Sequence, residues 1–222
     1  LESAEGRGLS ARTAALARAG VLWNASRIAE ACAELDGATA MAGGGPTDDW
    51  LEAVALSRQG RWSDAIERLD RALDEAPAGS TAHRSALLWR ERARGTLADH
   101  VGQLEDLSAL RQAGLDSVSL RARAAALWRL IGRPLEARRA FKELLADCHE
   151  QGSASAWREL VQATVGDWRL EASAAAVEAM PDEAVLWVER SQTLILADRF
   201  AEAYAVADQA VELDPEDPDA WM

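Results

Sequence analysis

The residues that most often carry chemistry are few in this chain, and they lie far apart. The three histidines are His83, His100 and His149, and none of them has a second metal ligand four residues away, as a zinc site on one helix would need. The two cysteines, Cys32 and Cys148, are predicted to be buried or solvated thiols in a reducing compartment, with a disulfide as the alternative. The sequence therefore predicts no metal site.

Motifs for nucleophilic or phosphate chemistry are also missing. The glycines at 43–45 precede a predicted helix, but no Lys-Ser or Lys-Thr follows them to grip a phosphate, and no Gly-x-Ser-x-Gly occurs. Pairs of Asp or Glu are plentiful, yet on Arg-rich helices such pairs usually form solvated i,i+4 ion pairs. We therefore predict that the chain is not an enzyme and uses no cofactor. The alternative is an active site built from dispersed residues.

Charge and hydropathy argue against two further classes of function. The formal net charge is −13, with 24 Lys and Arg against 37 Asp and Glu, whereas nonspecific nucleic-acid binding needs clustered cations. No window approaches the roughly 18 apolar residues of a membrane span, and no secretory signal is recognisable. We expect a cytoplasmic protein with neither a nucleic-acid nor a membrane partner. The chain begins at Leu1 and ends just after Trp221, so we expect it to be a fragment of something longer.

Carboxylates gather near the C-terminal end of the sequence. The simplest interpretation is that they solvate one end of the molecule, and the alternative is a site for a basic partner. The members of this acidic segment are Glu202, Asp208, Glu212, Asp214, Glu216, Asp217 and Asp219.

The elements that hold all these residues repeat along the chain. Pro181 and Pro215 are 34 residues apart, and so are Trp187 and Trp221. The same pattern recurs towards the N-terminus through short turns, most of them followed by an apolar residue and then by Ala. The predicted turns lie at positions 20, 60, 95, 132, 166 and 198. Such a period indicates helix pairs that bury their apolar faces only by stacking on one another.

Each unit follows one physical pattern. A first helix carries a large residue, Gly at the turn takes a positive φ, an apolar residue plugs the junction, and Ala lets the second helix approach closely. Pro then ends the unit because it cannot continue a helix. This pattern resembles the tetratricopeptide repeat (TPR). Residues 184–215, 47–77 and 118–148 match it best, the last without the Pro.

Two units depart from the TPR pattern. The unit around Gly95 places His100 where Ala is expected. The unit around Gly166 is predicted to have a short second helix that ends at Pro181.

The resemblance implies a fold and a domain organisation. We expect an all-α, right-handed α-solenoid of antiparallel helix pairs, with about ten to twelve helices and no sheet. Residues 1–40 are expected to form an N-terminal helix pair, with a degenerate repeat as one interpretation, and residues 41–46 a Gly-rich connector. A helix then begins near Trp50 and opens an array of about five repeats over 47–222, the last one truncated after Trp221.

Several repeat positions are predicted to be structural. Trp residues at the junction plug or early in a first helix are expected in the core, and Ala residues after the turn are expected where two helices cross. These residues are Trp62, Trp168 and Trp187, and Ala65, Ala137 and Ala203.

The resemblance also implies a binding surface. In TPR proteins, certain first-helix positions counted back from the turn tend to face the concave groove. Here Trp and Arg occupy them, and both commonly anchor peptide interfaces. The alternative is that these arginines only cover ordinary packing while their guanidinium groups stay in water. The predicted stripe is Trp50, Arg58, Trp89, Arg92 and Arg129.

The function implied by the resemblance is a protein-interaction scaffold that binds a peptide or a partner domain, within a larger, bacterial-looking polypeptide. Some TPR proteins hold the C-terminal carboxylate of chaperones through Lys and Asn side chains, but this chain has only Lys142 and Asn24, so that clamp is not expected. Two alternatives stay open: an accessory repeat region of a larger enzyme such as a transferase, and the sensor or oligomerisation arm of a transcription regulator.

Overall fold

The computed structural model describes residues 46–216, together with residues 14–15, 18–19, 30, 33–34 and 37–38. Within residues 46–216 the chain forms ten α-helices, and the described residues contain no strand. The predicted all-α class and helix pairs are therefore confirmed. The helices are α4 (Pro46–Arg58), α5 (Trp62–Glu75), α6 (Thr81–Thr96), α7 (His100–Gln112), α8 (Val118–Leu130), α9 (Pro134–Gln151), α10 (Ala154–Ala163), α11 (Gly166–Ala179), α12 (Ala184–Leu196) and α13 (Phe200–Leu213).

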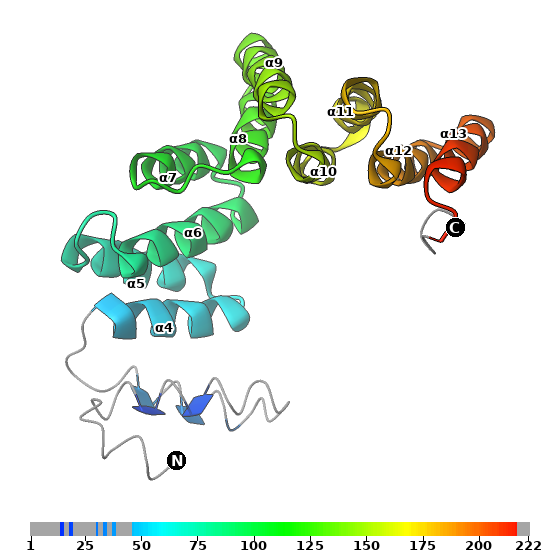
Figure 1. The fold of residues 1–222 in the computed structure, drawn as a ribbon. Coiled ribbons are helices and arrows are strands. Elements are labelled where there is room, and N and C mark those ends of the chain that lie inside the picture. The colour runs from blue at the N-terminus through cyan, green and yellow to red at the C-terminus, as the bar shows by residue number, and fades with distance from the viewer. Residues whose placement is uncertain are drawn as a thin grey trace. The chain divides into compact units, whose positions relative to one another are not determined.

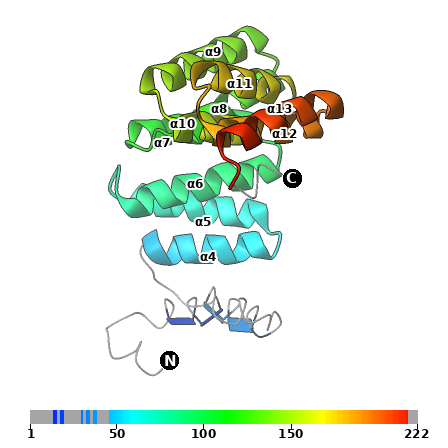
Figure 2. The same ribbon diagram turned by 45° about the vertical axis from the view of Figure 1, so that its right-hand side comes forward.

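The helices pack in sequential pairs within two compact units, Leu1–Leu115 and Asp116–Met222. In the first unit α4 packs on α5 and α6 on α7, and α6 also contacts both α4 and α5 (Figure 1). In the second unit the pairs are α8–α9, α10–α11 and α12–α13 (Figure 2). Here α10 contacts both α8 and α12. The first helix of each pair thus lies beside the first helix of the next pair in its unit.

Four of the five pairs share one backbone turn. One residue of each turn takes a positive φ of 58–78°, and the next N–H donates to the carbonyl five residues earlier at 2.8–3.0 Å. This is the Schellman arrangement that ends a helix in the left-handed region. The residues with positive φ are Gly60, Ala98, Gly132 and Asp198.

The turn between α6 and α7 was predicted at the wrong residue. The turn residue is Ala98, and Gly95 lies inside α6. Gly95 is there for packing: a Cβ atom on it would lie 2.5 Å from Nε2 of Gln103. Because the turn residue is at position 98 and not 95, the crossing position falls on Gln103 and not on His100. The corresponding residue in α5, α9 and α13 is Ala. Its amide donates to Glu91 at 2.8 Å in a buried hydrogen bond.

Two helix boundaries also differ from the prediction. Helix α4 begins at Pro46 and not near Trp50, because proline has the φ of a first helical residue and needs no N–H there. The second helix α11 is not short, since it has 14 residues like α5. The short helix of that pair is α10, with 10 residues.

The first unit has a core built from small and branched residues of three helices. Its buried members are Ala53 and Leu56 of α4, Ala65, Leu69 and Ala72 of α5, and Ala86 of α6. Trp50, Leu73 and Trp89 pack against this cluster and are partly buried.

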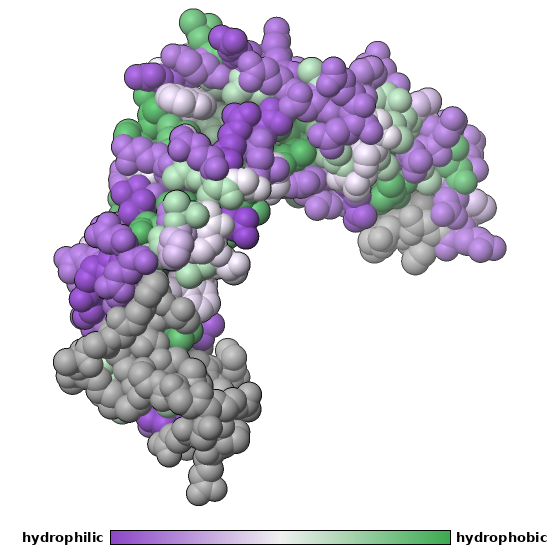
Figure 3. Space-filling view, turned by 60° about the vertical axis from the view of Figure 1, so that its left-hand side comes forward, coloured by the Kyte–Doolittle hydropathy of each residue, from purple (hydrophilic) through white to green (hydrophobic). Residues whose placement is uncertain are grey.

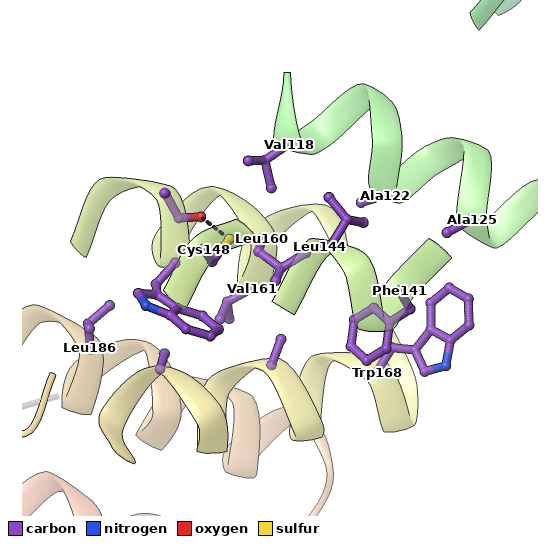
Figure 4. Packing of buried hydrophobic residues seen from close by; sticks show 14 of the residues in the cluster. Val118, Ala122, Ala125, Phe141, Leu144, Cys148, Leu160, Val161, Trp168 and Leu186 are labelled. Carbon is purple, nitrogen blue, oxygen red and sulfur yellow. Dashed lines mark hydrogen bonds between the residues drawn. The ribbon is translucent and has the colours of Figure 1, made fainter. Parts of the chain in front are cut away.

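The second unit has a larger core that runs from α8 to α12. At one end of this core Phe141 stacks on Trp168, with ring centroids 4.7 Å apart and planes 5° from parallel (Figure 4). Trp168 is therefore a core residue, as predicted. Trp62 and Trp187 are only half-buried, because Trp62 is the first residue of α5 and Trp187 turns its indole N–H to the carbonyl of Pro181 at 2.8 Å. For these two residues the core prediction was only partly right.

The predicted crossing residues are confirmed. Ala65 and Ala137 are 0% exposed and Ala203 is 3% exposed. Each follows the turn residue by five positions, so a side chain larger than methyl has no room there.

The predicted N-terminal pair and Gly-rich connector lie mostly outside the described residues. Of residues 1–40, the described Ala15, Ala19 and Ala38 are buried and form a small cluster. Leu51 and Ala55 of α4 pack against that cluster.

Candidate interaction surface

The predicted stripe lies on first helices, and four of its members are in the first unit. Trp50 and Arg58 are on α4, and Trp89 and Arg92 are on α6. Since α4 packs on α6 and both tryptophans touch the same core cluster, the structure brings Trp50 and Trp89 to one region. The arginines are exposed, whereas the tryptophans are half-buried.

Trp89 and Arg92 form the best defined contact of this region. The guanidinium carbon of Arg92 lies 5.7 Å from the centroid of the Trp89 ring, within the range of a cation–π interaction. Leu88, the residue before Trp89 in sequence, is 36% exposed. Trp50 differs, because its indole N–H is buried and has no hydrogen-bond acceptor. The surface therefore combines an apolar face with an exposed cation.

Arg129 belongs to the second unit, near the end of α8. It is exposed, but its guanidinium carbon lies 4.9 Å from the centroid of the Trp168 ring of α11. Arg138 lies over Phe141 at 5.7 Å and pairs with Glu171 at 2.5 Å. Arg129 thus lies over a ring of the core of the second unit, and its role in the predicted stripe stays a prediction.

Sequence reasoning missed a buried ionic cluster that joins α6 to α5 and α7. Asp106 is 0% exposed and accepts hydrogen bonds from Nε and Nη2 of Arg90 at 3.0 and 2.6 Å. Arg94 lies 3.1 Å from its other oxygen, and Arg90 also donates to Asp70 at 2.5 Å. Burial raises the pKa of Asp106, although the hydrogen bond from Arg90 acts in the opposite direction. These charges link α5, α6 and α7 inside the first unit.

The acidic segment is described as far as Glu216. Glu202 is engaged by Arg199 at 2.5 Å, and this hydrogen bond lowers the pKa of Glu202. Asp208 and Glu212 are exposed on α13. Neither of them forms an ion pair among the described residues.

Among the described residues, no three His, Cys, Asp or Glu side chains come together as a possible metal site. His100 instead lies 3.1 Å from the side-chain oxygen of Gln103. In the part of the chain with described coordinates, no helix is both long and apolar enough to span a bilayer.

The face drawn in Figure 3 is mostly hydrophilic, with hydrophobic residues in separate patches between the charged ones. Such a surface fits binding through a few anchor residues better than through one broad apolar area.

Comparison with known proteins supports the fold. No family model and no curated protein sequence matches the chain. A tetratricopeptide repeat protein from Parabacteroides merdae superimposes with a TM-score of 0.55 and 15% identity, over 95% of this chain and 82% of that protein.

Two other solved structures are less similar. YrrB, described as a TPR protein with an unusual peptide-binding site, has a TM-score of 0.41 and 16% identity, over 78% of this chain and 89% of YrrB. MamA from Desulfovibrio magneticus has a TM-score of 0.45 and 16% identity, over 80% of this chain and 99% of that structure.

The superposition on the Parabacteroides merdae protein supports the fold that the sequential pairing of the helices indicates. The described helices have the fold of the tetratricopeptide repeat proteins.

Proposed function

We propose that this chain is a protein-interaction scaffold that binds a peptide or a partner domain through the first helices of its first unit. The anchors in this proposal are Trp50 and Arg58 of α4 and Trp89 and Arg92 of α6. The observation that carries it is the Arg92–Trp89 contact, which places an exposed cation against a half-exposed indole ring.

This pair has the properties of an interface anchor. Trp supplies a large apolar area, and Arg keeps several N–H donors available while its plane lies on the ring. The contact also fixes both side chains before a ligand arrives, which reduces the entropy lost on binding.

The chemistry of the pair indicates the partner. A guanidinium recognises a carboxylate through two parallel hydrogen bonds, and an indole face accepts an apolar side chain or a peptide plane. We therefore propose an extended peptide with a carboxylate next to an apolar residue as the ligand. The net charge of −13 repels acidic ligands at long range, so binding depends on these local contacts.

Fluorescence anisotropy with labelled peptides tests this proposal. The probes are a peptide ending in an apolar residue with a free C-terminal carboxylate, and the same peptide amidated. We expect the free carboxylate form to bind more tightly, and Trp89→Ala or Arg92→Ala to weaken it by about 1–2 kcal/mol, or roughly 5- to 30-fold.

Matched controls come from second helices of the same unit. Trp62→Ala removes a half-buried Trp of α5, and Arg111→Ala removes an exposed Arg of α7. Equal losses in test and control variants, or equal binding of the amidated peptide, would refute the proposed site.

Arg129 stays a weaker candidate for the same role, because its guanidinium already lies on Trp168. The enzyme-accessory and regulator alternatives concern sequence outside these 222 residues and stay predictions.

A further inference from the structure

The turn between α8 and α9 exposes two leucines. Leu130, the last residue of α8, is 65% exposed, and Leu135, the second residue of α9, is 82% exposed. In the α4–α5 pair the residues at the same distances from the turn residue are Arg58 and Ser63, which are polar. Two large apolar side chains therefore face water beside one turn, where another pair has polar residues.

Two other pairs show how an arginine directly after the turn residue is used. Arg61 of the α4–α5 turn lies 2.6 Å from Asp64, and Arg199 of the α12–α13 turn lies 2.5 Å from Glu202. In both pairs the carboxylate follows the arginine by three residues. Each of these arginines therefore already has a carboxylate partner from its own helix.

Arg133 has the same place in the α8–α9 turn but makes a different contact. Glu136 follows it by three residues, yet no ion pair joins the two in the described part of the chain. The guanidinium carbon of Arg133 instead lies 5.4 Å from the centroid of the Trp128 ring, within the range of a cation–π interaction. In the two pairs above, Leu56 and Leu194 stand where Trp128 stands here. The ring of Trp128 therefore holds an exposed cation that no described carboxylate neutralises.

The sequence around this turn is basic within an acidic chain. Residues 129–143 contain five Arg or Lys against two Glu, a net charge of +3, whereas the whole chain carries −13. Two of the five cations form ion pairs with glutamates, and the other three have none among the described residues. Such unpaired cations favour a ligand of negative charge. These three cations are Arg129, Arg133 and Lys142.

The position of the turn within the chain excludes a further repeat as the occupant. Described helix pairs precede and follow α8 and α9 in sequence, and α10 already packs on α8. The net charge of −13 opposes both a second copy and an anionic bilayer. A nucleic acid would pair with the cations but would leave the two leucines without an apolar partner. The charges and the leucines together therefore favour a protein segment.

We propose that the α8–α9 turn binds an acidic segment of a partner protein, in which Asp or Glu pairs with Arg133 and an adjacent apolar side chain contacts Leu130 and Leu135. A guanidinium can hold a carboxylate by two parallel hydrogen bonds while its plane lies on an aromatic ring. The apolar contact removes the two leucines from water. This site lies in the second unit and does not depend on the peptide site of the first unit.

Fluorescence anisotropy against the full chain tests the proposal with two labelled peptides. Both have the same length, the same leucines and an amidated C-terminus, and they differ only in having Glu or Lys beside the leucines. We expect the Glu peptide to bind about 10-fold or more tightly than the Lys peptide. Arg133→Gln and Leu135→Ser should each weaken the Glu peptide by about 5- to 10-fold.

A further variant tests the role of the ring. Trp128→Leu introduces the residue that two other pairs have at this place. It should weaken the Glu peptide by about 3-fold or more, because Arg133 loses its ring and can turn to Glu136. Circular dichroism checks that this variant folds. Unchanged binding by a folded Trp128→Leu chain would contradict the proposed role of the ring.

Arg199→Gln is the matched control, since it removes the arginine from the same place of a turn in the same unit, where Glu202 already pairs with it. It should leave binding of the Glu peptide unchanged, and so should Arg92→Ala in the first unit. An equal loss with Arg199→Gln would show that only the net charge matters. A loss with Arg92→Ala alone would assign the peptide to the first unit. Either result, or equal binding of the two peptides, would overturn the proposal.

The acidic segment of the chain itself is a competing occupant. If it filled the turn, the double change Asp208→Asn with Glu212→Gln would strengthen binding of the Glu peptide by about 10-fold, because it removes an intramolecular competitor. If a second copy filled the turn, sedimentation would show self-association that Arg133→Gln abolishes. We expect neither result, and either one would overturn the assignment to a separate partner.

Discussion

The guanidinium carbon of Arg129 lies 4.9 Å from the centroid of the Trp168 ring, and that ring stacks on Phe141 with centroids 4.7 Å apart. Arg138 lies over Phe141 in turn, at 5.7 Å. The stack joins α8, α9 and α11 and closes the turn end of the core of the second unit. Arg129 thus lies over a buried ring of the second unit, whereas Arg92 lies over a half-buried indole of the first unit.

The contact between Arg129 and Trp168 predicts that Arg129→Ala lowers the free energy of unfolding by about 0.5–1 kcal/mol, which is the usual contribution of an exposed cation–π contact. Lys142→Ala is the control, since Lys142 is exposed on α9 and should change the value by less than about 0.5 kcal/mol. Urea denaturation followed by circular dichroism measures both. Unchanged stability together with weaker peptide binding would instead favour a role of Arg129 in the binding stripe.

Repeat spacing predicted most of the fold because the turn between two helices and the point where they cross each restrict which residue types fit. Ala65 and Ala137 must be small where helices cross, and Gly60 and Gly132 must take a positive φ. These requirements leave the same residue types in the sequence wherever they apply.

The predicted turn was wrong in the α6–α7 pair, because there a residue of the first helix supplies the small side chain that close helix crossing requires. In the α6–α7 pair the small residue at the crossing is Gly95 of the first helix, and the second helix contributes Gln103. The turn then uses Ala98, a residue that gives no sequence signal for positive φ. Long-range charge pairs such as Arg90–Asp106 were missed because, in sequence, each looks like an ordinary exposed helix charge.

Overpacking at a regular crossing is the second prediction. Ala137→Leu adds a branched side chain at a fully buried position next to Phe141 and should cost about 1–3 kcal/mol of unfolding free energy. The neighbouring Glu136 is exposed, so Glu136→Gln should stay within about 0.5 kcal/mol. Similar effects from the two changes would show that the crossing is assigned to the wrong residue.

The irregular crossing gives a prediction about coupling. Gly95→Ala should destabilise by about 1–3 kcal/mol, because the new methyl would lie 2.5 Å from Nε2 of Gln103. In a chain that carries Gln103→Ala, the same change should cost less or even stabilise, since Ala favours a helix over Gly by about 0.5–1 kcal/mol. A double-mutant cycle measures this difference. Strict additivity of the two changes would mean that Gly95 and Gln103 do not interact.

The ionic cluster predicts an unusual pH dependence. Asp106→Asn should cost about 1–3 kcal/mol, less than a fully broken buried pair, because Arg90 keeps Asp70 as a partner. Burial raises the pKa of Asp106 in the folded chain, so the fold favours its protonated form. The stability that this carboxyl contributes is present at low pH and is lost as the pH rises through its folded pKa.

Urea unfolding between about pH 4 and 7 tests the sign of that linkage. The stability difference between the wild type and Asp106→Asn should grow as the pH falls. If the attraction of Arg90 outweighed burial, the difference would shrink instead.

Cys148 provides the last prediction, at alkaline pH. Its side chain is fully buried, and its thiol donates to the carbonyl of Ala156 at 3.6 Å (Figure 4). Burial, with a smaller effect from Asp147, raises the pKa of this thiol from 9.0 to about 11. The folded chain therefore favours the neutral thiol, and the resulting stability is fully present below about pH 9 and is lost as the pH rises to about 11.

In a chain with Cys32→Ser, unfolding free energy should fall more steeply over this range than in the same chain with Cys148→Ala. The native thiol should also react slowly with a disulfide reagent at about pH 8, because the thiolate is the nucleophile. Parallel pH profiles for the two chains, or fast labelling of the folded protein, would mean that the thiol reaches water.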